Sequence, residues 1–102
     1  MSKKMKIDIP RGRIAEFCKK NHIRKLSLFG SVLRNDFKPK SDIDILVEFE
    51  EGQVVGFLRL AGMEIELSEI LGRKVDLRTP AELSRYFRQE VLDKAEVQYA
   101  EG

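Results

Sequence analysis

The chain has 102 residues, 42% of them hydrophobic and 35% charged, a composition typical of a folded globular domain rather than a disordered chain. Its 19 basic and 17 acidic residues leave a net charge of +2, which gives no argument for binding nucleic acid. One cysteine, Cys18, excludes an internal disulfide and fits a reducing compartment. No apolar run reaches the length of a membrane span, and the first residues lack the apolar core of a signal peptide. We therefore expect one cytoplasmic domain over residues 1–102.

The first predicted element is a helix that begins near Pro10 and ends near Asn21. Proline suits the first turn of a helix, and Asp8 lies just upstream as a candidate cap. The apolar positions of this helix follow the i, i+3, i+4 spacing of one buried face: Ile14, Phe17 and Cys18.

The first predicted strand covers residues 25–29, which alternate in polarity and favour β-structure. Gly30 and Ser31 come directly after this strand and indicate a tight turn. A loop rich in basic residues then leads to the second predicted strand.

The second predicted strand covers residues 43–49 and is expected to be half buried. Alternation gives it one apolar face, made of Ile43, Ile45, Val47 and Phe49. The opposite face carries Asp42 and Asp44, together with Leu46 and Glu48. Because residues two apart on a strand point the same way, the two aspartates aim their carboxylates at one place.

A long helix is predicted from Gly56 to Leu71, because apolar side chains recur along one broad stripe: Phe57, Leu60, Met63, Leu67, Ile70 and Leu71. Gly72 is expected to end this helix, and the polar face of the helix is expected to be surface. Residues 75–78 form the third predicted strand, with Asp76 on its outward side.

A further helical region is predicted from Thr79 and Pro80 onward, with apolar positions at Leu83, Tyr86, Phe87, Val91, Leu92 and Ala95. Tyr86 and Phe87 are expected in the core, although an exposed aromatic here could instead serve a partner. Residues 97–99 alternate in polarity, which fits either a short edge strand or a frayed helix end.

This order of elements predicts an α/β protein of the α+β type, a small mixed β-sheet covered on one face by helices. The other face of the sheet is then available for chemistry. If the second and third strands pair, the carboxylates of Asp42, Asp44 and Asp76 converge on that face.

Three converging carboxylates suggest a magnesium site. Two unpaired carboxylates so close together repel each other unless a cation neutralises them. Mg²⁺ prefers a few carboxylates together with substrate phosphates, and a third carboxylate would allow a second ion. Such a pair of ions activates an attacking hydroxyl and stabilises a leaving pyrophosphate.

The Gly-Ser turn completes the predicted site. Gly30 lets the backbone approach a phosphate because it has no Cβ, and Ser31 adds a hydroxyl donor at the start of a short helix. Arg34, Lys38 and Lys40 could neutralise a triphosphate, although solvated loop positions fit the two lysines better. A lone Gly-Ser or Asp-x-Asp is common, but the two separated by ten residues and framed by strands form a specific combination.

The segments LFGS, SDIDILVEF and GRKVDL resemble the minimal nucleotidyltransferase family of the DNA polymerase β-like superfamily, over essentially the whole chain. The resemblance implies the nucleotidyltransferase fold and Mg²⁺ bound by Asp42, Asp44 and Asp76. It also implies that Asp76 helps to activate the acceptor and that Gly30 and Ser31 grip the triphosphate of ATP.

The chain departs from the family beside Arg34. Members commonly have Ala-Arg-Gly after the Gly-Ser-x segment, whereas this chain has Leu33, Arg34 and Asn35. Asparagine tolerates the left-handed backbone that glycine often supplies, and neither change removes a ligand.

Stand-alone family members of this size resemble the antitoxins of two-gene modules whose partner is a HEPN-domain ribonuclease toxin. The implied reaction transfers AMP from ATP to a tyrosine hydroxyl of that toxin. The alternative is a non-catalytic module that senses nucleotide and neutralises its partner by complex formation. Direct binding of nucleic acid has little support, because no row of base-stacking aromatics is visible. A homo-oligomer stays open.

Overall fold

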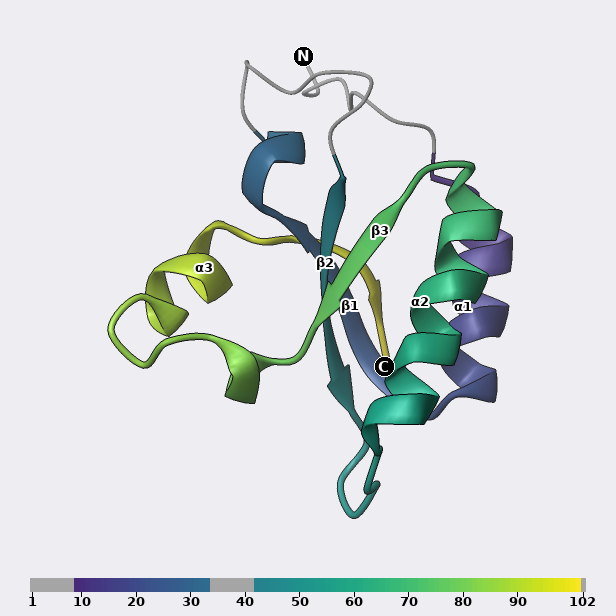
Figure 1. The fold of residues 1–102 in the computed structure, drawn as a ribbon, viewed down its shortest axis with the longest axis horizontal. Helices are drawn as coiled ribbons and strands as arrows, with labels where there is room; N and C mark the ends of the chain where they lie inside the picture. The colour runs from purple at the N-terminus through teal and green to yellow at the C-terminus, as the bar shows by residue number, and fades with distance from the viewer. Residues whose placement is uncertain (1–8, 34–41, 102) are drawn as a thin grey trace.

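The computed structural model describes residues 9–33 and 42–101, which fold around one four-stranded sheet (Figure 1). The strands are β1, Ile23–Phe29; β2, Ile43–Phe49; β3, Val75–Arg78; and β4, Glu96–Ala100. The α-helices are α1, Arg11–Lys20; α2, Phe57–Leu71; and α3, Arg88–Lys94. Two short 3-10 helices complete the described elements: η1, Gly30–Leu33, and η2, Pro80–Glu82. The α+β class predicted from the sequence is confirmed.

The sheet is mixed and has the strand order β3-β2-β1-β4. β1 runs antiparallel to both β2 and β4, whereas β2 and β3 are parallel. The predicted pairing of the second strand with the third is therefore present. At the end of the chain the edge strand is the right alternative, because Tyr99 and Ala100 pair with Leu26 and Lys25 of β1.

The core lies between one face of the sheet and the two helices α1 and α2, which stand side by side on that face (Figure 1). The predicted apolar faces of α1, α2 and β2 supply its buried side chains, among them Ile14, Phe17, Cys18, Ile43, Ile45, Val47, Met63 and Leu67. Each large aliphatic side chain buried in this way contributes roughly 1.5–3 kcal/mol. None of the helices in residues 9–33 and 42–101 is long and apolar enough to cross a membrane.

The starts of α1 and α2 differ from the sequence-based expectation. Pro10 is the N-cap of α1 rather than a residue of its first turn, and Asp8 lies outside the described residues. Phe57 begins α2 but is 83% exposed, so its predicted place in the core is wrong. The fully buried positions of α2 begin later, at Met63, where the helix runs against the sheet.

The segment after β3 is only partly helical. Thr79 and Glu82 form a capping box around η2, in which the Thr79 N–H donates to Glu82 Oε1 at 3.0 Å. Leu83 then has an extended backbone, which ends η2 well before α3 begins. Tyr86 and Phe87 lie in the intervening turn and are 85% and 49% exposed, so the prediction of a core position is wrong and the exposed alternative is right.

Cys18 gives the protein a predictable dependence of stability on pH. The thiol is buried in the core, and burial raises its pKa from 9.0 to about 12. We expect its contribution to the free energy of unfolding to be constant below about pH 9 and to disappear as the pH rises toward 12. The reason is that between about pH 9 and pH 12 the thiol ionises in the unfolded chain but stays protonated in the folded protein.

The Cys18→Ala variant provides the comparison for this prediction. Its urea midpoint should fall less steeply than that of the unmodified protein when both are measured between pH 8 and 10.5, about the range in which a free thiol ionises. Parallel pH profiles for the two proteins would contradict the prediction.

Candidate functional site

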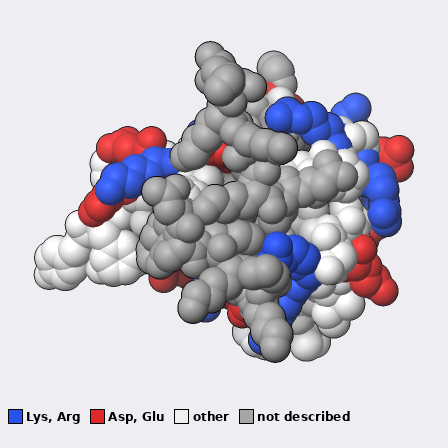
Figure 2. All heavy atoms as spheres, turned by 90° about the horizontal axis from the view of Figure 1, so that it is seen from above, with Lys and Arg blue, Asp and Glu red and all other residues white. Residues whose placement is uncertain are grey.

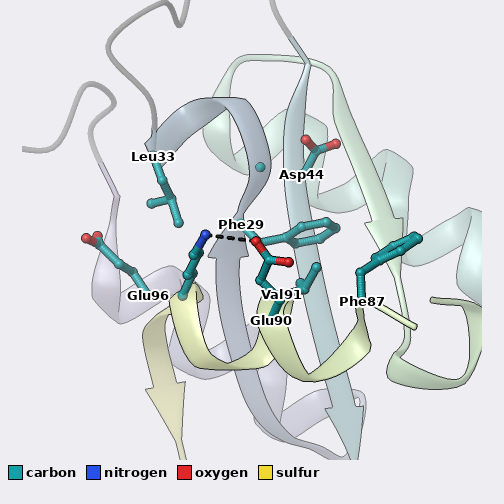
Figure 3. Close-up of a pocket in the computed structure, with 9 residues that line it drawn as sticks. Phe29, Leu33, Asp44, Phe87, Glu90, Val91 and Glu96 are labelled. Atoms are coloured by element: carbon teal, nitrogen blue, oxygen red, sulfur yellow. Dashed lines mark hydrogen bonds and ion pairs between the residues drawn. The ribbon is translucent and has the colours of Figure 1, made fainter. Parts of the chain in front are cut away.

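The Gly-Ser turn meets the second strand where β1 ends. Phe29, the last residue of β1, pairs with Asp44 of β2, and Gly30 follows it directly (Figure 3). Gly30 has a φ of +75°, and a Cβ built on it would lie 2.2 Å from Asp44 Oδ2. Any side chain at this position would therefore collide with the carboxylate, which makes glycine a requirement of the arrangement.

Asp44 and Asp76 stand next to each other on the paired strands β2 and β3. They are register partners, and the residues on either side of each are buried. Asp42 lies two residues before Asp44, so the alternation of the strand places it on the same side. The three predicted carboxylates thus share the face of the sheet that is opposite to α1 and α2, as the sequence predicts.

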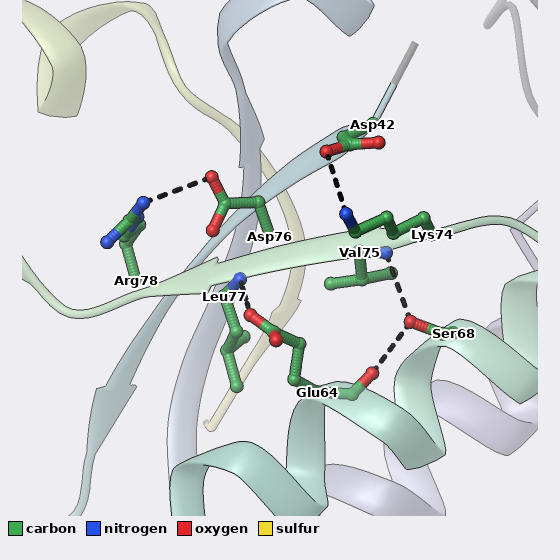
Figure 4. Close-up of polar contacts among 8 residues, drawn as sticks. All are labelled: Asp42, Glu64, Ser68, Lys74, Val75, Asp76, Leu77 and Arg78. Atoms are coloured by element: carbon green, nitrogen blue, oxygen red, sulfur yellow. Dashed lines mark hydrogen bonds and ion pairs between the residues drawn. The ribbon is translucent and has the colours of Figure 1, made fainter. Parts of the chain in front are cut away.

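Asp42 and Asp76 each lie beside a cationic side chain (Figure 4). The partner of Asp42 is Lys74, the residue before β3, and the partner of Asp76 is Arg78, the last residue of β3. Lys74 Nζ lies 3.9 Å from Asp42 Oδ2, and Arg78 Nη2 lies 3.3 Å from Asp76 Oδ2. The side chains of both pairs are at least 36% exposed, so solvent weakens the attraction and the pairs add little stability. The two carboxylates are therefore turned toward separate partners.

The donor set fits the chemistry of magnesium, although it does not form a ready-made cage. Within the described residues, no three His, Cys, Asp or Glu side chains gather closely enough to hold a metal ion. Mg²⁺ usually takes one or two protein carboxylates and completes its shell with phosphate and water oxygens. Asp44 and Asp76, paired in register, are ligands of that kind. The assignment of Mg²⁺ to Asp42, Asp44 and Asp76 stays a prediction.

The other predicted phosphate contacts follow Gly30 in the chain. Ser31 is the second residue of η1, so its backbone lies directly after the glycine that touches Asp44. Arg34, Lys38 and Lys40 lie outside the described residues. Their roles, like that of the Ser31 hydroxyl, stay predictions.

A cavity of about 710 Å³ opens beside Gly30 and Asp44, and sequence analysis missed one of its walls (Figure 3). The side formed by β1, η1 and β2 consists of Phe29, Gly30, Leu33 and Asp44. The facing side comes from α3 and the residues next to it: Phe87, Glu90, Val91, Lys94 and Glu96. The volume falls in the range of small-molecule sites, roughly 300–1,000 Å³.

The sequence contains only a weak signal for this second wall. Val91 falls at a helical spacing that fits a core position as well as a cavity lining. Glu90 and Lys94 form an i, i+4 ion pair at 2.9 Å, a pattern that is usual on solvated helices. It is the packing of α3 across from η1 that places these residues at the cavity.

The end of the molecule that carries η1 and the start of β2 shows charges of both signs. In Figure 2, which looks down on this end, Lys and Arg side chains lie beside Asp and Glu over the described part of the surface. The described side chains of this end therefore form no patch of a single sign.

The sequence matches known nucleotidyltransferases over most of its length. The family profile described as nucleotidyltransferase domain covers residues 11–97. The chain is 37% identical over 91 residues to the candidate protein adenylyltransferase MJ0435 of Methanocaldococcus jannaschii, spanning 89% of this chain and 96% of that protein. It is also 37% identical over 70 residues to protein adenylyltransferase MntA of Thermococcus cleftensis, spanning 69% of each.

Solved structures share the fold. A toxin–antitoxin complex with AMP-PNP contains a chain that matches with a TM-score of 0.72 at 21% identity, covering 90% of this chain and 74% of that one. A tri-AMPylated Shewanella oneidensis HEPN toxin in complex with MNT antitoxin gives a TM-score of 0.64 at 22% identity, covering 88% and 69%. Fold and sequence agree: the chain belongs to the nucleotidyltransferase domain family and is a nucleotidyltransferase, as the resemblance implied.

Proposed function

We propose that this protein is a cytoplasmic antitoxin that transfers AMP from ATP, with Mg²⁺, to a tyrosine hydroxyl of a HEPN-type RNase toxin. The observation that carries the proposal is the contact of Gly30 with Asp44 beside a nucleotide-sized cavity, in a domain of this family. One relative named a protein adenylyltransferase and one structural neighbour containing an AMPylated HEPN toxin support the choice of AMP and of the acceptor.

In the proposed reaction, the tyrosine oxygen forms a bond to the α-phosphorus of ATP, and the bond from that phosphorus to pyrophosphate breaks. The tyrosine proton passes to a nearby base, for which the carboxylate of Asp76 is the candidate. Gly30 leaves room for phosphate oxygens next to Asp44 because it has no Cβ. Mg²⁺, when held by Asp42, Asp44 and Asp76, supplies positive charge to the triphosphate.

The shape of the site suggests how ATP binds. Its triphosphate would lie along the backbone of Gly30 and Ser31, and the guanidinium of Arg34, three residues further along the chain, would supply a cation. The nucleoside would then occupy the cavity between η1 and α3, where Phe29 and Phe87 offer aromatic surface. An acceptor tyrosine has access from the solvent side, since Asp76 is not fully buried.

The test combines the purified protein, MgCl₂ and a HEPN-domain toxin encoded next to it. ATP labelled at the α-phosphate should label the toxin, whereas ATP labelled at the γ-phosphate should not, because pyrophosphate leaves. EDTA should prevent labelling, and mass spectrometry should place each added AMP on a tyrosine. Absence of label from both folded proteins, with each of the common nucleotides and with Mg²⁺ or Mn²⁺, would overturn the proposal.

A further inference from the structure

β3 carries Asp76, and it is a short strand at the edge of the sheet. It has four residues, and of the described strands it pairs with β2 alone. The carbonyl of Lys74 accepts the Ile43 N–H at 2.9 Å, so the backbone polar groups of Lys74 point toward β2. Backbone polar groups alternate in direction along a strand, so those of Val75 and Leu77 point the other way. The N–H groups of Val75 and Leu77 must then point away from the sheet, and among the described residues no strand lies beyond β3 to accept them.

Two side chains of α2 accept these outward amides (Figure 4). The Val75 N–H donates to Ser68 Oγ at 3.0 Å, and the Leu77 N–H donates to Glu64 Oε2 at 2.8 Å. The Ser68 hydroxyl donates in turn to the Glu64 carbonyl at 2.8 Å. Since Glu64 and Ser68 are one helical turn apart, a single face of α2 holds both amides.

The two bonded amides stand directly before and after Asp76 in the chain. Hydrogen bonds on both sides of a residue fix the backbone from which its side chain projects. The bond to Glu64 has a charged acceptor and is therefore the stronger of the two. The two bonds therefore fix the stretch of β3 that carries Asp76, the register partner of Asp44.

We infer that Glu64, assisted by Ser68, is a positioning residue that holds the Asp76 carboxylate beside Asp44 for nucleotide transfer. The inference rests on the proposed function, because it gives Asp76 a part in the reaction. Glu64 acts through the backbone of β3 and does not touch the substrate. The expectation that the polar face of α2 is only surface is therefore wrong at these two positions.

Three variants of α2 separate positioning from general stability. Glu64→Ala removes the acceptor of the Leu77 amide, whereas Glu64→Gln keeps an oxygen in the same place. Glu69→Ala removes an exposed glutamate of the same helix and is the matched control. Each variant is measured for hydrogen exchange of the Val75 and Leu77 amides, thermal unfolding, and the kcat and KM of AMP transfer.

We expect Glu64→Ala to speed exchange at Leu77 and to lower kcat about 100-fold, the loss typical of a small misplacement of a reacting group. KM for ATP should stay the same, because Gly30 and Ser31 are unaffected. Glu64→Gln should recover most of kcat, and Glu69→Ala should behave as the unmodified protein. If Glu64→Ala does not fold, Ser68→Ala provides the same test at Val75 with a smaller loss.

The outcomes distinguish this inference from the proposed function. An unmodified protein that transfers no AMP contradicts the proposed function itself. If the unmodified protein is active and Glu64→Ala keeps its kcat, or keeps slow exchange at Leu77, only the positioning role is overturned. Asp76→Asn is measured in parallel, and full activity in that variant would also overturn the inference.

Discussion

Replacing Asp42 and Asp44 together with asparagine should lower the rate of AMP transfer at least about 100-fold while leaving the protein folded. Asparagine keeps the shape of aspartate but has no negative charge with which to hold the Mg²⁺ of the proposed reaction, and a metal ion of this kind is typically worth several kcal/mol of transition-state stabilisation. Little stability should be lost, because the pair of Asp42 with Lys74 is long, at 3.9 Å, and exposed. Single-turnover transfer and thermal unfolding in metal-free buffer measure the two effects separately.

The matched control is Asp93→Asn, because Asp93 is an exposed carboxylate of α3 that does not line the cavity. It should change neither the rate nor the melting temperature. A large fall in the melting temperature of the double variant would show that the two carboxylates serve the fold. If the double variant still neutralised the toxin in cells, complex formation alone would suffice and the non-catalytic alternative would be right.

Much of the sheet could be predicted because alternation within a strand is a local property. The predicted bounds of the second and third strands, residues 43–49 and 75–78, agree with β2 and β3. The same alternation placed Asp42, Asp44 and Asp76 on the polar side, and that placement needs no knowledge of distant residues. Pairing of the strands then brought the three onto one face.

The region of Tyr86 and Phe87 could not be predicted in this way. Apolar residues at helical spacing show which side of a helix is apolar, but they do not show whether a helix forms or reaches the sheet. Here the capping box of Thr79 and Glu82 begins a short 3-10 helix, the extended backbone of Leu83 ends it, and the chain turns before α3 begins. That turn exposes both aromatic side chains and gives the cavity its second wall.

The contacts that define the site depend on residues far apart in the sequence. A glycine after a strand signals a turn, but only the register of β1 with β2 shows that Gly30 meets Asp44. Likewise, Glu64 and Ser68 look like ordinary polar residues of an amphipathic helix. Their hydrogen bonds to β3 follow from the packing of α2 against an edge strand, which no local pattern encodes.

Gly30→Ala should reduce AMP transfer at least about 100-fold while costing no more stability than alanine at any other left-handed glycine. Alanine in that backbone conformation costs roughly 1–2 kcal/mol. The added Cβ at Gly30 would also lie 2.2 Å from Asp44 Oδ2. That oxygen is the tip of a side chain that can rotate away, so the collision is relieved cheaply in energy, but the carboxylate leaves its place at the site.

Gly72→Ala and Gly52→Ala are the controls that isolate this effect. Their φ angles are +67° and +86°, close to the +75° of Gly30, and nothing lies within 4 Å of a Cβ at either position. Each should lower the melting temperature by about 4–8 °C per kcal/mol lost and leave the rate of transfer unchanged. Gly30→Ala should match them in melting temperature and fall far below them in rate. Equal rates in the three variants would show that the contact of Gly30 with Asp44 is dispensable for catalysis.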